Sequence, residues 1–145
     1  DAYVADFIRG ISKTKVMGAA SIMREPEAAV FLSQKPRVAL ETMQSRRLTH
    51  AFVLDSPKTF VGVITIDEAA QAVQEGISSI GEWDTLGKAE NLKAPPDTSI
   101  DDLVPMAAVN ECPIAIVDGN DQLLGVVSRS ILLSAIAESH RSQAE

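Results

Sequence analysis

The pattern of apolar and polar positions predicts a small unit of strands and helices that occurs twice along the chain. Continuous apolar runs of strand length alternate with polar turn sequences, which is typical of strands buried on both faces. These runs are 28–32, 51–54 and 60–65 in the first copy, and 113–117 and 123–128 in the second. Helical patterns lie between and after the runs, so the predicted order in each copy is β-α-β-β-α.

Local signals indicate where the helices begin. Pro36 suits the first turn of a helix that runs to about Arg47, because its missing N–H would be unpaired there anyway. One of the polar residues at 97–99 can cap the corresponding helix of the second copy. The helices that close the two copies are expected to start from Asp67 and Ser130 as N-caps.

The two copies share one six-residue phrase in register. Residues 62–67 are Gly-Val-Ile-Thr-Ile-Asp and residues 125–130 are Gly-Val-Val-Ser-Arg-Ser, an offset of 63 positions. The turn sequences 55–58 and 118–121 keep the same offset, and each joins two apolar runs as an expected antiparallel hairpin. A register kept over about 30 positions indicates duplication, so function is expected where the copies meet.

Punctuation between the copies predicts the domain boundaries. Glycines and the pair Pro95-Pro96 mark a connection with one helical turn, in which Trp83 either packs on the repeats or faces a partner, packing being the default. The expected parts are a lead-in helix (1–14), repeat one (15–76), a linker (77–90), repeat two (91–138) and a frayed tail (139–145). Because the chain begins inside a helical pattern, we expect it to be a piece of a longer protein.

Composition and charge narrow the classes of function. Apolar residues make up 46% and charged residues 23%, which is typical of a globular chain. The net charge of −7 disfavours nucleic acid as the partner, because that binding needs clustered Lys and Arg. The single Cys112 cannot form an intrachain disulfide, so a cytoplasmic location is expected.

Motifs for catalysis or metal binding fail on spacing. Residues 81–88 resemble a phosphate-binding loop, but five residues separate the glycines instead of four, and Ala89 stands where a hydroxyl is needed. His50 and His140 are far apart and belong to no Cys/His cluster with ligand spacing. Cys112 has no neighbouring His that would activate it. We therefore expect this chain to be neither an enzyme nor a metal protein.

The repeated phrase supplies the remaining candidate site. Thr65 and Asp67 stand where a strand passes into a helix, and a carboxylate there can accept from a ribose diol while free N–H groups receive phosphate. In the second copy Ser128 supplies the hydroxyl and Arg129 a cation, but Ser130 replaces the acid. The competing interpretation is that these residues only cap helices and end strands, and local chemistry alone favours it.

The duplicated unit, ending twice in Gly-apolar-apolar-Thr/Ser-x-Asp/Ser, resembles the cystathionine-β-synthase (CBS) domain, which occurs in tandem as a Bateman module. The resemblance covers residues 15–138. It implies an α+β fold of two β-α-β-β-α repeats about a pseudo-two-fold axis, with two clefts for adenosine-type ligands. By position, the residues it implies are Thr65 and Asp67 in one cleft, Ser128, Arg129 and Ser130 in the other, and Ala51, Phe52, Pro113 and Ile114 beside the base.

Sequence around the repeats is also similar to the C-terminal regulatory tail of the ATP-binding subunit of glycine betaine/L-proline ABC importers. Residues 4–11, 15–20, 60–67 and 124–133 carry this likeness. It implies an ABC ATPase domain upstream, a homodimer of CBS pairs, and a place at the inner face of the cell membrane through the permease subunit. The implied signals are AMP, ATP, cyclic di-AMP or ionic strength, with no required cofactor. The alternatives are a ligand-free dimerisation platform and a regulatory module of another enzyme or channel.

Overall fold

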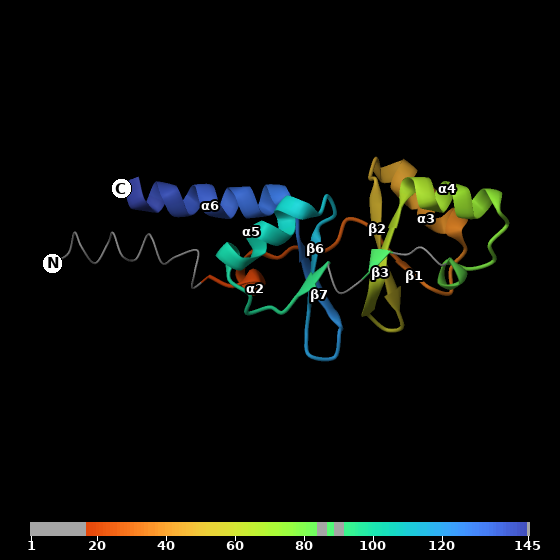
Figure 1. Cartoon of the computed structure of the whole chain (residues 1–145), viewed down its shortest axis with the longest axis horizontal. Coiled ribbons are helices and arrows are strands. Elements are labelled where there is room, and N and C mark those ends of the chain that lie inside the picture. The colour runs from red at the N-terminus through yellow and green to blue at the C-terminus, as the bar shows by residue number, and fades with distance from the viewer. Residues whose placement is uncertain (1–16, 84–86, 89–91, 145) are drawn as a thin grey trace. The chain divides into compact units, whose positions relative to one another are not determined.

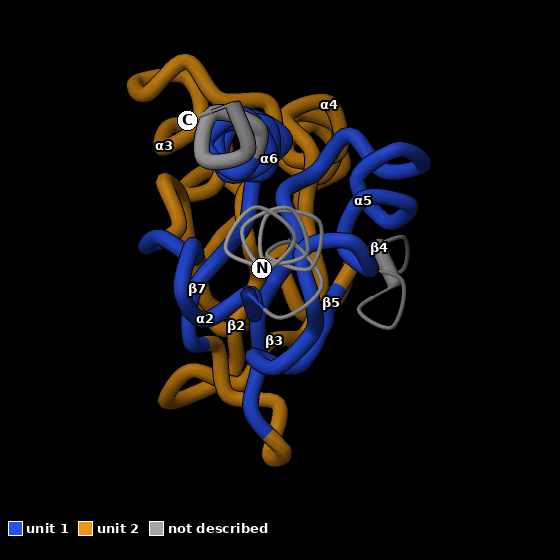
Figure 2. The backbone as a smooth tube through the Cα atoms, turned by 90° about the vertical axis from the view of Figure 1, so that its left-hand side faces the viewer, with its two compact units in different colours: residues 1–25, 93–118, 124–145 blue, residues 26–92, 119–123 orange. Residues whose placement is uncertain are grey.

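A computed structural model describes residues 17–83, 87–88 and 92–144 (Figure 1), so the expected lead-in helix over 1–14 lies outside the described residues. The described residues form two compact units (Figure 2). Unit 1 comprises 17–25, 93–118 and 124–144, and unit 2 comprises 26–83, 87–88, 92 and 119–123. Within this part of the chain, no helix is long and apolar enough to cross a membrane.

Unit 2 holds a four-stranded sheet in the order β1-β2-β3-β4. Its strands are β1 (Ala29–Phe31), β2 (His50–Asp55), β3 (Thr59–Thr65) and β4 (Gly87–Lys88). β1 pairs with β2 in parallel, and the other two pairings are antiparallel. The helices are α3 (Pro36–Arg46) and α4 (Ile66–Gln74), which contribute Ala39, Met43 and Ala69 to one core with Val53 and Ile64 of the sheet.

The other face of this sheet is also buried. Phe52, Leu54, Phe60 and Val63, which alternate with the core residues, are each 5% exposed or less. The rings of Phe52 and Phe60 lie 5.8 Å apart between centroids and are tilted by 57°, as aromatic pairs prefer. The prediction of strands buried on both faces is therefore confirmed for this unit.

Unit 1 holds a three-stranded sheet in the order β5-β6-β7. Its strands are β5 (Lys93–Ala94), β6 (Ile114–Val117) and β7 (Leu123–Val127). Its helices are α2 (Ala19–Ile22), α5 (Ile100–Val109) and α6 (Arg129–Ala144). Ile100, Leu103, Ile116, Val127 and Leu132 are central members of its core, to which both long helices contribute.

Residues 17–25 belong to unit 1, although the sequence assigned them to the first repeat. The Ala19 N–H donates to the Thr98 carbonyl at 2.8 Å, and the backbones of Arg24 and Val126 exchange hydrogen bonds of 2.9 and 2.8 Å. The compact units therefore differ from the predicted repeat boundaries, because these pairings join residues far apart in the chain.

The turn at 119–123 belongs to unit 2, where it pairs with the turn of the first hairpin. Thr59 and Gln122 form an antiparallel bridge, and the Gln122 side-chain amide donates to the Thr59 hydroxyl at 2.7 Å across 63 positions. Two backbone hydrogen bonds of 2.8 Å flank this bridge, from the Phe60 N–H to the Asp121 carbonyl and from the Leu123 N–H to the Lys58 carbonyl. Equivalent positions of the two repeats therefore meet each other, which supports the duplication.

The expected β-α-β-β-α order is confirmed in both repeats, with four corrections. The helix α5 starts from Ser99, whose hydroxyl accepts from the Asp102 N–H at 3.1 Å, and the single turn Ile80–Glu82 lies in the connection as predicted. The strand β4 in the linker was not predicted. The prediction of a frayed tail over 139–145 is wrong, since α6 continues to Ala144. The other two corrections concern the N-caps of α4 and α6.

Gly125 leaves no room for a side chain in β7. A Cβ at this position would lie 2.9 Å from Met23 Cγ and 3.0 Å from the Arg24 carbonyl oxygen. Because Arg24 is fixed by its bridge to Val126, Gly125→Ala is expected to lower the free energy of unfolding by about 1–3 kcal/mol in urea denaturation. Gly119→Ala, where the new Cβ would meet nothing within 4 Å, is the control. Equal stability of the two variants would contradict the packing of residues 23–24 on β7.

Candidate functional site

Thr65 joins β3 to α4 and is the N-cap of that helix. Its hydroxyl oxygen accepts from the Glu68 backbone N–H at 3.1 Å, and the Glu68 carboxylate accepts from the Thr65 backbone N–H at 3.1 Å. These two bonds form a complete capping box. The prediction that Asp67 caps this helix is therefore wrong, and Asp67 lies exposed in the first turn.

The first turn of α4 offers side chains more than backbone donors. The Ile66 N–H donates to the Thr49 carbonyl at 2.9 Å, and the Glu68 N–H donates to the Thr65 hydroxyl. The prediction of free N–H groups at this helix start is therefore wrong for these two. In the bond from the Glu68 N–H, the Thr65 hydroxyl accepts through a lone pair, so its O–H can still donate to a ligand. With the exposed Asp67 carboxylate, the arrangement can supply one donor and one acceptor to a diol.

Ala51 and Phe52 lie on the neighbouring strand at the same end of the sheet. In the antiparallel register Ala51 pairs with Ile64 and Phe52 with Val63. Ala51 is fully buried in the core under the helices, and Phe52 is only 4% exposed. The side chain of Ala51 therefore faces the core, and a base at this strand would contact backbone.

Two residues near Thr65 were missed by sequence reasoning. His50 pairs with Thr65 in the strand register and is half-buried, with its Nδ1 2.8 Å from the Thr49 hydroxyl. Nothing local in the sequence distinguishes it from a strand-end residue. Glu68 could have been predicted, because Thr65-x-x-Glu68 is the sequence pattern of a capping box.

In the second repeat the predicted site residues bind one another and the protein. The Ser128 hydroxyl accepts from the Ile131 N–H at 3.2 Å and lies 3.1 Å from the Ser130 hydroxyl oxygen. Ser128 therefore precedes α6 as its cap, and the prediction of Ser130 as N-cap is wrong. Of the base-facing candidates, Ile114 is 2% exposed within the core, and Pro113 is half-buried just before β6.

Arg129 binds the carboxyl end of α5. Its Nε donates to the Ala107 carbonyl at 2.8 Å, and Nη2 donates to the Asn110 carbonyl at 3.2 Å. A cation at this end satisfies terminal carbonyls and complements the negative end of the helix dipole. Arg129 was expected to supply a cation to a ligand of the second cleft, but in this structure its guanidinium caps α5.

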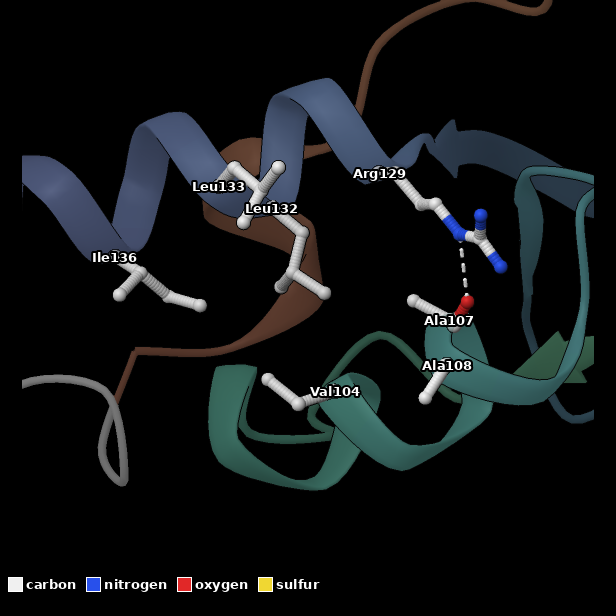
Figure 3. A pocket seen from close by; sticks show the side chains of 7 residues that line it. All are labelled: Val104, Ala107, Ala108, Arg129, Leu132, Leu133 and Ile136. Atoms are coloured by element: carbon white, nitrogen blue, oxygen red, sulfur yellow. Dashed lines mark hydrogen bonds between the residues drawn. The ribbon is translucent and has the colours of Figure 1, made fainter.

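Unit 1 also has an apolar groove between α5 and α6 (Figure 3), with a volume of about 190 Å³. Its lining residues are Val104, Ala107, Ala108, Arg129, Leu132, Leu133 and Ile136. Val104 and Leu133 are 40% and 65% exposed, which is unusual for large apolar side chains that share one groove. Among the residues with described positions, no cluster of three His, Cys, Asp or Glu could hold a metal ion.

Two β-α-β-β-α repeats, each closed by a helix that a hydroxyl caps, define a tandem α+β module. The CBS domain model matches residues 19–75 and 89–138, which is most of the chain. The chain therefore belongs to the CBS domain family and contains a pair of these domains. This confirms the expected fold class and the family.

Two curated relatives are ATP-binding proteins of glycine betaine transport. The chain is 29% identical over 135 residues to the glycine betaine transport ATP-binding protein OpuAA of Bacillus subtilis, covering 93% of this chain and 31% of that protein. It is 27% identical to the glycine betaine/carnitine transport ATP-binding protein GbuA of Listeria monocytogenes, covering 93% of this chain and 33% of that protein. The chain thus spans about a third of the length of these relatives.

Solved structures share the fold. Staphylococcus aureus OpuCA matches with a TM-score of 0.67 and 20% identity, covering 81% of this chain and 97% of that one. CBSX2, a CBS-pair protein of Arabidopsis thaliana solved in complex with AMP, matches with a TM-score of 0.68 and 21% identity, covering 86% and 98%. At these identities the likeness establishes the fold alone.

The capping box predicts a measurable cost for removing the Thr65 hydroxyl. Thr65→Ala is expected to lower the free energy of unfolding by about 1 kcal/mol, because the Glu68 N–H loses its acceptor. Thr65→Ser keeps a capping oxygen and should recover most of this loss. Urea denaturation of the three proteins checks the prediction, and equal stability of the alanine and serine variants would count against Thr65 as the cap.

Proposed function

We propose that this chain is a non-catalytic regulatory CBS pair from the ATP-binding subunit of a glycine betaine/proline ABC importer. In this role it lies on the cytoplasmic side of the membrane and adjusts transport through an ATPase domain in the same protein and a permease subunit. The names of the relatives support this host, and the family supports a regulatory role. A module that serves another enzyme or channel is the alternative.

We further propose that the first repeat binds an adenine nucleotide. The observation that carries this proposal is the difference between the repeats. Asp67 is an exposed carboxylate beside a hydroxyl that can still donate, whereas the second repeat has Ser130 in place of the acid and uses Arg129 to cap α5. A ribose diol would accept from Thr65 and donate to Asp67, and the base would lie along the backbone of β2 at 51–52.

Two solved structures of similar fold support the adenosine part of this choice. CBSX2 was solved with AMP, and the CBS pair of MJ0100 was solved with 5′-methylthioadenosine and S-adenosyl-L-methionine. All three ligands contain adenosine, so the ribose and base are the shared groups. A response to ionic strength without any nucleotide is the competing mechanism.

Isothermal titration of the chain with AMP, ATP and cyclic di-AMP tests the nucleotide site. We expect heat with at least one of them, and we expect Asp67→Asn to weaken that binding about tenfold, which is about 1.4 kcal/mol. The matched control is Asp101→Asn, because Asp101 is an exposed acid at the same position of α5, two residues after its N-cap. No heat from any of the three ligands, or equal affinity of Asp67→Asn and wild type, would refute the proposal.

A second proposed role is dimerisation through the groove between α5 and α6. Leu133 and Val104 expose apolar surface there, and Leu132 and Ile136 extend the same lining (Figure 3). We propose a second copy of this chain as the occupant, because a two-fold dimer buries the same apolar patch from both subunits. Such a dimer would hold two ATPase domains in a fixed relation.

Sedimentation velocity at high micromolar concentration tests this role. We expect a dimer for the wild type and a monomer for Leu133→Glu, because a charge would be buried without a partner. Leu124→Glu is the matched control, since Leu124 is 44% exposed but lies on β7 outside the groove. A monomeric wild type, or dissociation of both variants, would contradict dimerisation through this surface.

A further inference from the structure

In the first repeat, a series of hydrogen bonds leads from Thr65 of the candidate ligand site through Glu68 to Trp83. Glu68 contributes one carboxylate oxygen, Oε1, to the capping box with Thr65. Its other oxygen, Oε2, accepts from the indole Nε1–H of Trp83 at 3.1 Å. Glu68 therefore bonds to the hydroxyl-bearing residue of the site and to the first residue after the 3₁₀ turn.

Trp83 stands where the chain leaves the first repeat. The turn before it is anchored by Ile80, which is fully buried and donates its N–H to the Gln34 carbonyl at 2.8 Å. The next described residues, Gly87–Lys88, pair with Gly62 and Val63 of β3, the strand that ends at Thr65. The described parts of the connection therefore contact the first repeat on both sides of the junction at Thr65. Trp83 bonds to α4 after the junction, and Gly87–Lys88 pair with β3 before it.

We propose that Glu68 and Trp83 are positioning residues that transmit occupancy of the Thr65 site to the connection between the repeats. This inference rests on the nucleotide site proposed above. A ribose that accepts a hydrogen bond from the Thr65 hydroxyl changes the position of Thr65. The backbone N–H of Thr65 donates to the Glu68 carboxylate, so the carboxylate moves with it. Because the indole N–H of Trp83 donates to the other oxygen of the same carboxylate, Trp83 follows that shift. The position of the Trp83 side chain thereby differs between the free and the bound state.

Trp83 is itself the reporter, because it is the only tryptophan in the chain. Its emission, followed while AMP or ATP is added, should change and saturate at the same Kd that isothermal titration gives. Trp83→Phe keeps an aromatic ring but removes the N–H donor. By reciprocity, a coupling that responds to the ligand also affects its affinity, so this variant should bind about three- to tenfold more weakly.

Glu68→Gln separates the coupling from helix capping. Gln can replace Glu in a capping box, but the Thr65 N–H and the Trp83 indole N–H bond to different carboxylate oxygens of Glu68. In Gln one of these oxygens becomes an NH₂ donor, so with its oxygen kept in the capping box the side chain has no acceptor facing the indole. The emission change on binding should therefore fall at least threefold, while the urea midpoint stays near that of the wild type. Glu75→Gln, an exposed carboxylate at the other end of α4, is the control and should leave emission change and affinity as in the wild type.

The possible failures are distinguishable. If isothermal titration shows no heat with the wild type, the nucleotide site is refuted and the transmission falls with it. If heat is present but Trp83 emission does not change and both variants bind like the wild type, only the transmission is refuted. An emission change of full size in Glu68→Gln would also refute it, because the signal would then reach Trp83 without Glu68.

Discussion

In both repeats a hydroxyl at the end of the last strand accepts the third N–H of the closing helix, and the rest of the candidate site depends on this bond. Thr65 accepts from Glu68, and Ser128 accepts from Ile131. Because the bond fixes where the helix begins, it places Asp67 and Ser130 in the first turn, outside the sheet. The repeated phrase therefore specifies a strand-to-helix junction, and its exposed polar residues are candidates for ligand binding.

The two junctions have the same geometry but different chemistry. In the first repeat the carboxylate of Glu68 completes the cap and leaves Asp67 exposed. In the second repeat Arg129 contacts the carbonyls at the end of α5, and the Ser130 hydroxyl lies against Ser128. The two halves thus share one fold, while Asp67 in the first and Ser130 in the second give the two junctions different polar groups.

Most of the elements were predictable because they are coded by local pattern. Continuous apolar runs predicted both hairpins. Pro36 marked the start of α3 correctly, and the candidates at 97–99 for the N-cap of α5 include the actual cap, Ser99. The N-caps of α4 and α6 were misassigned because threonine, serine and aspartate all cap helices. The choice between them depends on where the strand ends. The capping-box spacing from Thr65 to Glu68 would have corrected the first of these errors.

The remaining features arise from contacts that sequence pattern does not record. Arg129 reaches a carbonyl 22 positions away, and Trp83 reaches Glu68 across 15 positions. The strand β4 has only two residues, so its pairing with β3 has no apolar run to reveal it. Residues 17–25 pair with the second repeat, which no repeat boundary in the sequence indicates. Such long-range bonds decide which polar residues remain available to a ligand.

An AMP titration followed by two-dimensional NMR of the labelled chain tests the central claim most directly. The account predicts that the amide signals of residues 65–68 and the indole N–H signal of Trp83 shift together, with one saturation curve. It also predicts that the signals of residues 128–130 shift less. Shifts centred on Arg129 and its neighbours, with residues 65–68 unmoved, would contradict it.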